Sequence, residues 1–290
     1  MITVRVPATS ANCCVGFDSL GLALEWKSAI SFEPADTLVI TGCPAEYQNE
    51  DNLVWKAFAA ACAAGGITAG GVHIHIDSDI PFARGLGSSS QCIAAGILGA
   101  NALLGLNLSD EKMLETATDL EGHPDNAAPA FFGGLCTCVS EEDRILHIRL
   151  ESGGWKSLIV IPPYPISTHE ARKVLPAQIP LHEAAMQTGR AILFEYAWVH
   201  REEKLLHEMC KDVLHEPYRA ALIGDYPDLK AIADRHEIPF WISGSGSTMI
   251  FVSQSEKQLE KAEADIRHLG LDVLLRKAAV SDKGAEVIYG

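Results

Sequence analysis

The feature that most constrains the fold of this chain is the run Gly85-Leu-Gly-Ser-Ser-Ser90, which lies between an alternating strand pattern and a long run of small residues. Glycines let a backbone curl until successive N–H groups point into one concavity. The helix that the small residues predict would add its free N–H groups and the positive end of its dipole. The sequence therefore predicts a strand–loop–helix unit that binds an anion such as phosphate.

This loop differs from the familiar phosphate-binding patterns. A Walker A loop requires a lysine before its Ser or Thr, and the run matches neither that pattern nor GxGxxG. The hydroxyls of Ser88 and Ser89 are suited to bind phosphate oxygens or Mg²⁺. A glycine-serine loop that only caps a core helix has the same composition, so the run by itself leaves both interpretations open.

Strand and helix patterns occur in both halves of the chain. Residues 72–76 alternate between apolar and polar side chains, which predicts a strand with one buried face. Residues 52–64 predict a helix that the following glycines end. Because regular βαβ alternation is missing, we expect an α+β fold. A composition shift near residue 154 predicts two domains, 1–153 and 154–290.

Composition excludes several classes of protein. A formal charge of −15 argues against non-specific binding of nucleic acid, which needs a basic surface. The most apolar stretch, residues 92–106, is too short for a membrane span, and residues 1–7 lack the pattern of a secretory signal. The eight cysteines form no CxxC pair, so we expect buried free thiols and a cytoplasmic location.

Three segments resemble, in order and spacing, the sequence pattern of the GHMP kinases, and within that family the homoserine kinases. Residues 7–18, PATSANCCVGFD, are similar to the family's PATSANxGxGFD, and residues 242–248, ISGSGST, are similar to its ISGxGPT. The phosphate loop, residues 81–90, lies between them. Three ordered motifs are more specific than any one of them, and the resemblance spans nearly the whole chain.

The chain departs from the family pattern at four positions. Gln91 replaces an alanine and Ser247 a proline, while Cys14 and Val15 stand where Gly and Pro are usual. A Cβ in place of glycine restricts the backbone. We therefore expect Cys14 to narrow the substrate pocket, which bears on the identity of the acceptor and not on the nucleotide site.

The resemblance implies a fold, an activity and its partners. The fold is the two-domain GHMP kinase fold, with an N-terminal domain like ribosomal protein S5 domain 2 and a ferredoxin-like C-terminal domain. The activity is transfer of the γ-phosphoryl group of ATP to the hydroxyl of L-homoserine, a step of threonine biosynthesis. Further implications are ATP and Mg²⁺ as cofactors and a homodimer, with neither nucleic acid nor membrane as a partner.

The segment Glu121-Gly-His-Pro-Asp-Asn126 concentrates functional groups. Two carboxylates, an imidazole and an amide within six residues are costly to bury without a purpose, although an exposed polar turn has the same composition. By resemblance, Glu121 ligates Mg²⁺ together with Ser88 and Ser89. His123, Asp125 and Asn126 would line the substrate pocket.

The same resemblance implies the remaining site residues. Asn12 and Asp18 would hold the hydroxyl and ammonium groups of the substrate, and Arg172 and Arg219, in segments similar to the family's STxEAR and PYR, would clamp its carboxylate. Asn52 matches a position near the adenine but is an equally good helix N-cap. The nucleotide-binding residues implied are Pro81, Arg84, Gly85, Leu86, Gly87, Ser88, Ser89, Ser90 and Asn52.

The identity of a catalytic base stays open. The candidates for catalytic residues are Asn126, Asp18 and Glu121. Some family members have an aspartate where Asn126 stands, and an amide cannot accept a proton, so direct attack by the hydroxyl is the alternative. Another GHMP kinase acting on a mevalonate-like or sugar alcohol, and a non-catalytic nucleotide sensor on the same fold, are the rival functions.

Overall fold

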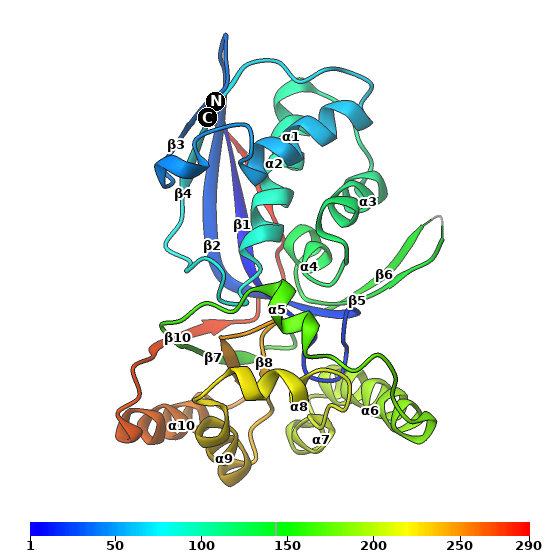
Figure 1. Ribbon diagram of the computed structural model, residues 1–290, viewed down its shortest axis with the longest axis vertical. Helices are drawn as coiled ribbons and strands as arrows, with labels where there is room; N and C mark the ends of the chain where they lie inside the picture. The colour runs from blue at the N-terminus through cyan, green and yellow to red at the C-terminus, as the bar shows by residue number, and fades with distance from the viewer. Residues whose placement is uncertain (143) are drawn as a thin grey trace.

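A computed structural model describes residues 1–142 and 144–290 and shows two layered units, one above the other in Figure 1. The first unit is built on a seven-stranded sheet in which β1 and β2 are central. The strand order is β11-β1-β2-β4-β3, and β5 joins β2 and β6. The strands are β1 (Ile2–Ala11), β2 (Leu20–Pro34), β3 (Val39–Thr41), β4 (Val72–Asp77), β5 (Leu135–Ser140), β6 (Ile145–Leu150) and β11 (Glu286–Tyr289).

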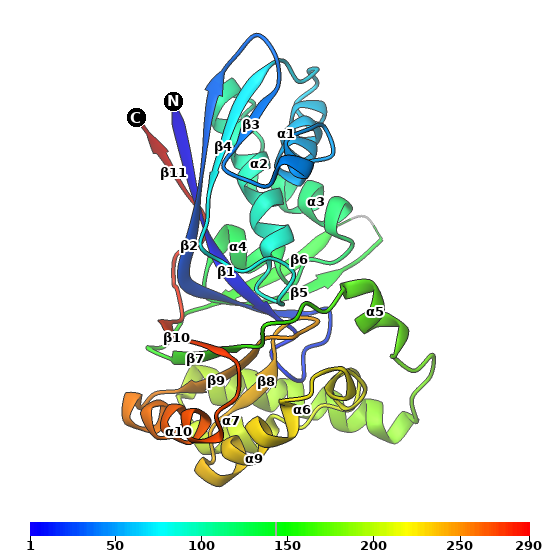
Figure 2. The ribbon, with the colours of Figure 1, turned by 60° about the vertical axis from the view of Figure 1, so that its left-hand side comes forward.

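Four helices cover one face of this sheet (Figure 2). They are α1 (Leu53–Ala64), α2 (Ser88–Leu104), α3 (Asp110–Glu121) and α4 (Ala127–Phe132), and a 3-10 turn, η1 (Ala45–Tyr47), precedes α1. The apolar residues between sheet and helices form one core, which includes Phe32, Phe58 and Ile74. Alternation in β4 buries Val72 and Ile74 and turns His75 outward, as the sequence predicts.

The second unit is a four-stranded antiparallel sheet with the order β10-β7-β9-β8. Its strands are β7 (Lys156–Ile161), β8 (Phe240–Ile242), β9 (Met249–Ser253) and β10 (Leu274–Ala279). With helices after β7 and after β9, the chain order is βαββαβ, which is the ferredoxin-like arrangement. The expectation for this half of the chain is confirmed.

Helices and one 3-10 turn occupy the connections of the second unit. Six of the seven elements lie between β7 and β8, and the seventh lies between β9 and β10. They are α5 (Thr168–Lys173), α6 (Leu181–His200), α7 (Glu203–Met209), α8 (Glu216–Arg219), η2 (Ala220–Leu222), α9 (Tyr226–His236) and α10 (Glu256–Leu269).

The two faces of the second sheet pack against different parts of the molecule. Leu158 and Val160 of β7 pack with residues of α9 and α10, whereas Ile159 and Ile161 face the other way. Period-two alternation along a strand produces this division. The second face shares a core with Trp26 of β2 and with residues of α6, so the two units are joined by apolar packing.

The last strand of the chain returns to the first unit. β11 pairs antiparallel with β1, with Ile2 opposite Tyr289, and the two termini lie side by side (Figure 2). The domain boundary at residue 154 stays a prediction. β11 comes after that boundary in the sequence but belongs to the sheet of the first unit. The eight cysteines are all free thiols and six of them are buried, as predicted. Of the helices among the described residues, none is long and apolar enough to cross a membrane.

Close contact between α1 and α2 depends on Gly96, because a Cβ there would lie 2.3 Å from the Val54 carbonyl oxygen. We expect Gly96→Ala to lower the free energy of unfolding by about 1–3 kcal/mol through overpacking. Gly189 on α6 has nothing within 4 Å of its Cβ position. Gly189→Ala should therefore be neutral or stabilising by up to about 1 kcal/mol. Denaturant unfolding measures both, and equal effects would contradict the prediction.

Candidate active site

A cavity of about 430 Å³ lies where the two units meet. Its lining combines the phosphate loop, the turn after β1, the start of α4 and segments of the second unit. Predicted site residues that line it are Asn12, Asp18, Asn52, Gly85, Gly87, Ser88, Ser89, Glu121, His123, Asp125, Asn126, Arg172 and Arg219.

One wall of the cavity is the N-terminus of α2. The helix begins at Ser88, and Gly87 at its N-cap has φ 66°, in the left-handed region that favours glycine. A Cβ at Gly87 would lie 1.9 Å from Thr9 Oγ1, so the loop also needs glycine for space. A 17-residue helix thus directs its free N–H groups and positive dipole end toward the cavity.

Three segments distant in sequence lock together around this loop. The first motif contacts the loop through Thr9 N–H, which donates to the Leu86 carbonyl at 3.1 Å. The third motif does so through Ser243 Oγ, which donates to the Gly85 carbonyl at 2.5 Å. Gly244 N–H donates to the Ala11 carbonyl at 3.1 Å, which joins the first motif to the third. The segment 243–248, which carries the third motif, therefore closes on the phosphate loop.

Glu121, the last residue of α3, reaches the phosphate loop. Ser89 Oγ donates a hydrogen bond to Glu121 Oε2 at 2.6 Å. Burial raises the pKa of the Glu121 carboxyl, although the Ser89 hydroxyl opposes this shift. A hydroxyl and a carboxylate side by side are oxygen ligands of the kind that Mg²⁺ takes.

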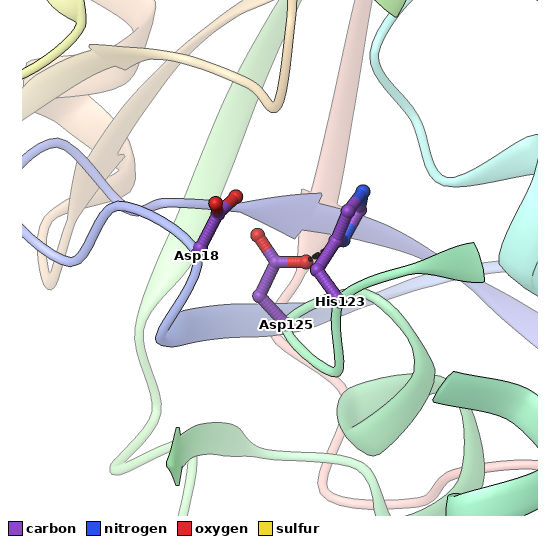
Figure 3. A group of neighbouring side chains, drawn as sticks. All are labelled: Asp18, His123 and Asp125. Carbon is purple, nitrogen blue, oxygen red and sulfur yellow. Dashed lines mark hydrogen bonds and ion pairs between the residues drawn. The ribbon is translucent and has the colours of Figure 1, made fainter. Parts of the chain in front are cut away.

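Asp18, His123 and Asp125 form a second polar cluster (Figure 3). One ligand atom from each lies within 4.8 Å of the others, so the group is able to hold a cation. His123 Nδ1 is 2.5 Å from Asp125 Oδ1. Burial opposes protonation of His123, but the Asp125 carboxylate outweighs burial and raises the pKa of His123.

Two arginines from the second unit face this cluster. Arg172 binds both carboxylate oxygens of Asp18, with Nη2 at 2.7 Å and Nη1 at 3.1 Å. Arg219 is buried, and it donates through Nη1 to the Gly244 carbonyl at 2.9 Å and through Nε to the Ala171 carbonyl at 3.3 Å. Burial, together with the nearby Arg172, lowers the pKa of Arg219 to about 10.

Three asparagines are fixed by hydrogen bonds at the cavity wall. Asn126 Oδ1 accepts from Thr9 Oγ1 at 2.7 Å, and Asn12 Nδ2 donates to the Gly244 carbonyl at 3.0 Å. Asn52 Oδ1 accepts from Val54 N–H at 2.9 Å, which makes Asn52 the N-cap of α1. Asn52 therefore has a structural role. Because it also lines the cavity, its role in binding the nucleotide stays a prediction.

The remaining predicted residues do not line the cavity. Leu86 and Ser90 are buried, and Arg84 donates to the Pro163 carbonyl at 2.8 Å. Like Pro81, these residues shape the loop without lining the cavity. The lining also includes apolar residues that were not among the predicted site residues, because nothing local in the sequence marks them as facing a ligand: Cys43, Pro44, Tyr47, Leu53, Ile76 and Phe82.

The expectation that Cys14 narrows the pocket is wrong. Cys14 keeps a φ of 66°, a value in the left-handed region that glycine adopts readily. Its side chain is not part of the cavity lining. Its Sγ lies 3.5 Å from Glu216 Oε2 in a buried region of the second unit. The extra side chain is therefore accommodated behind the turn and leaves the cavity lining unchanged.

Comparisons with known proteins agree with this geometry. The family described as "GHMP kinases N terminal domain" matches residues 52–134, and "GHMP kinases C terminal" matches residues 197–270. A homoserine kinase of Clostridium beijerinckii is 37% identical over 100% of this chain and 99% of its own length.

Solved structures give the same result. The crystal structure of homoserine kinase from Cytophaga hutchinsonii superposes with a TM-score of 0.86 at 27% identity, covering 99% of this chain and 97% of the other. A mevalonate kinase of Methanococcus jannaschii reaches a TM-score of 0.71 at 15% identity, covering 97% and 98%, which shows a shared fold alone.

Gly87 and Gly105, at the two ends of α2, allow a matched test of the loop. Both have positive φ, but a Cβ at Gly105 has nothing within 4 Å. We expect Gly105→Ala to destabilise the fold by about 1–2 kcal/mol through backbone strain, and Gly87→Ala to destabilise it by more because its Cβ also clashes with Thr9. Only Gly87→Ala should also abolish ATP binding, because its Cβ displaces Thr9 and the loop N–H groups. Calorimetric titration of both folded variants with ATP measures this, and equal affinity for ATP would refute it.

Proposed function

The chain belongs to the GHMP kinase family, and we propose that it acts as a homoserine kinase. It transfers the γ-phosphoryl group of ATP to the side-chain hydroxyl of L-homoserine and releases ADP and O-phospho-L-homoserine. The observation that carries the proposal is the Asp18–Arg172 ion pair, which lies in the same cavity as the N-terminus of α2. An amino-acid site and an anion site thus share one cavity.

Different parts of the lining suit the two parts of the nucleotide. The apolar lining residues, with Tyr47, Leu53 and Phe82, suit the adenine ring, and the α2 N-terminus suits the phosphates. Phe82 and Tyr47 are half exposed, and an aromatic ring of this kind is suited to stack on a base. With a chain charge of −15, backbone N–H groups provide a local attraction for a polyphosphate that the overall charge does not.

The residues present fit a magnesium ion. The hydroxyl of Ser89 and the carboxylate of Glu121 lie beside the phosphate loop, with Oγ and Oε2 2.6 Å apart. Ser88 precedes Ser89 in the first turn of α2. Ser88, Ser89 and Glu121 would hold the ion. It would neutralise the negative charge that develops on the phosphates during transfer.

The acceptor would exchange ion pairs with the protein. L-Homoserine carries an ammonium and a carboxylate, which are the charge complements of Asp18 and Arg172. On binding, the ammonium would replace Arg172 at Asp18, and the carboxylate would pair with Arg172 and the buried Arg219. The two arginine guanidinium carbons lie 5.5 Å and 5.2 Å from the centroid of the Phe17 ring, so one aromatic ring orients both.

The chemical step then depends mainly on positioning. His123, Asp125 and Asn126 would aim the hydroxyl at the γ-phosphate from the start of α4. Asn126 cannot accept a proton, so we propose direct attack, with the proton passing to phosphate or water. Asp18 is the alternative base, and its pairing with Arg172 favours a binding role over a catalytic one.

We also propose that the enzyme is a cytoplasmic homodimer. Exposed apolar side chains gather on the outer face of α6, where Leu181 is 86%, Ile192 65% and Val199 53% exposed. A second copy would bury such a face. Eight free thiols suit a reducing compartment.

The dimer is tested by sedimentation equilibrium of the wild type and of Ile192→Glu. We expect twice the monomer mass for the wild type and a shift toward monomer for the variant, because a buried charge disfavours the interface. Lys257→Glu on α10, an exposed change on another helix, is the control and should keep the dimer. A wild type that sediments as a monomer at micromolar concentration would contradict the proposal.

The acceptor is tested by measuring ADP release with Mg-ATP and homoserine, mevalonate, galactose or shikimate. Homoserine should give the highest kcat/KM. We expect Arg172→Ala to raise the KM for homoserine by about 10- to 100-fold, since it removes charge-assisted hydrogen bonds. The KM for ATP should stay the same, and so should both constants in the exposed control Arg5→Ala. Faster ADP release with mevalonate or a sugar would replace the homoserine assignment.

A further inference from the structure

The turn that carries Asp18 into the cavity has an unusual backbone. Asn12, Cys13 and Cys14 have φ values of 70°, 40° and 66°, and Asp18 has 54°. Residues other than glycine rarely adopt this left-handed conformation, and three in succession are unfavourable. The turn therefore persists only if its surroundings hold it.

Two side chains of the second unit hold the carbonyl groups of this turn. His215 Nε2 lies 2.7 Å from the Cys14 carbonyl oxygen, and Gln187 Nε2 donates to the Val15 carbonyl at 2.8 Å. Both side chains are buried, His215 completely. The His215 ring also stacks on Phe17, with centroids 5.4 Å apart, so His215 contacts the turn at two points.

Asp212 fixes both of these side chains. Its Oδ1 accepts from Gln187 Nε2 at 2.6 Å, and its Oδ2 accepts from the backbone N–H groups of His215 and Glu216 at 2.6 Å and 2.7 Å. The carboxylate thus caps the start of α8, the short helix that ends at Arg219. Asp212 is buried, so water does not compete for these bonds.

The two ring nitrogens of His215 have different partners, which defines the tautomer. The Cys14 carbonyl only accepts, so Nε2 must carry the proton. Nδ1 lies 3.4 Å from Arg219 Nη1, which only donates, so Nδ1 must be the unprotonated nitrogen. These contacts require a neutral ring, and burial acts in the same sense because it lowers the pKa of His215, which the nearby Asp212 carboxylate offsets only in part.

We propose that His215 is a positioning residue that couples the Asp18 turn to Arg219 across the cavity. Its Nε2–H holds the strained turn at Cys14, and its Nδ1 orients the guanidinium of Arg219. Asp18 and Arg219 are the two groups assigned to opposite charges of the acceptor, so the inference rests on the proposed function. The spacing of these two charges, and with it the affinity for a zwitterionic acceptor, depends on one neutral imidazole.

The tautomer is tested without any activity measurement. Long-range ¹H–¹⁵N NMR spectra of protein labelled with ¹⁵N-histidine, recorded at pH 7, separate the two neutral tautomers and the cation. The His215 signals are identified by their loss in His215→Gln. We expect a neutral ring with its proton on Nε2. A proton on Nδ1, or a charged ring, would overturn the proposal even if the protein phosphorylates homoserine.

The coupling is tested by three substitutions of His215 with side chains of different length. Glutamine can place an amide N–H near the position of Nε2, asparagine is too short, and alanine has no donor. We expect His215→Asn and His215→Ala to raise the KM for homoserine by about 10-fold, the effect of one lost buried hydrogen bond. The kcat and the KM for ATP should change by less than about 2-fold, and His215→Gln should restore most of the affinity.

The controls separate positioning from folding and from the function itself. His200→Ala, at an exposed histidine of α6, should leave all constants unchanged. Equal KM values for the Gln and Asn variants, or parallel changes in KM for both substrates, would refute the coupling. If alanine prevents folding, the Gln and Asn pair decides. If the wild type prefers another acceptor, the proposed function fails, and the same comparison is made with that acceptor.

Discussion

The structure depends on a set of main-chain hydrogen bonds that join three loops from distant parts of the sequence. The N–H of Thr9 bonds to the Leu86 carbonyl, that of Gly244 to the Ala11 carbonyl and that of Thr248 to the Arg84 carbonyl. Gly85 is needed there because a Cβ at this position would lie 2.2 Å from the Ser243 carbonyl oxygen. Phosphoryl transfer relies on positioning more than on covalent help from the protein. A junction built from backbone, which has no rotamers to lose, provides that positioning at the boundary between the two units.

The charged groups of the cavity are also held in place by hydrogen bonds between distant segments. The protein has a net charge of −15, but the N-terminus of α2 and two arginines provide positive charge at the cavity. Arg172 is held by Asp18, and Arg219 is held by carbonyl groups and flanked by a neutral imidazole. Arg219 is therefore oriented before any ligand arrives, which limits the reorganisation that binding requires, whereas Arg172 would exchange Asp18 for the carboxylate of the acceptor.

Local sequence patterns predicted most of the secondary structure and the residues of the three motifs. The cap at Asn52, the alternation in β4 and the glycine at the start of α2 all act within a few residues, so a single sequence reveals them. Other features arise from contacts between distant segments. The apolar lining with Tyr47 and Phe82, the direction of the Cys14 side chain and the pairing of β11 with β1 have no local signature. The roles of His215 and Asp212 likewise emerged only when the fold brought them behind the Asp18 turn.

The pairing of the first strand with the last has a consequence for biosynthesis. β1 (Ile2–Ala11) is synthesised well before its partner β11 (Glu286–Tyr289). One edge of β1 therefore has no native partner until β11 is synthesised. An open strand edge is a template for unwanted pairing with other chains. The nascent protein must keep this edge protected until β11 has emerged and can pair with β1.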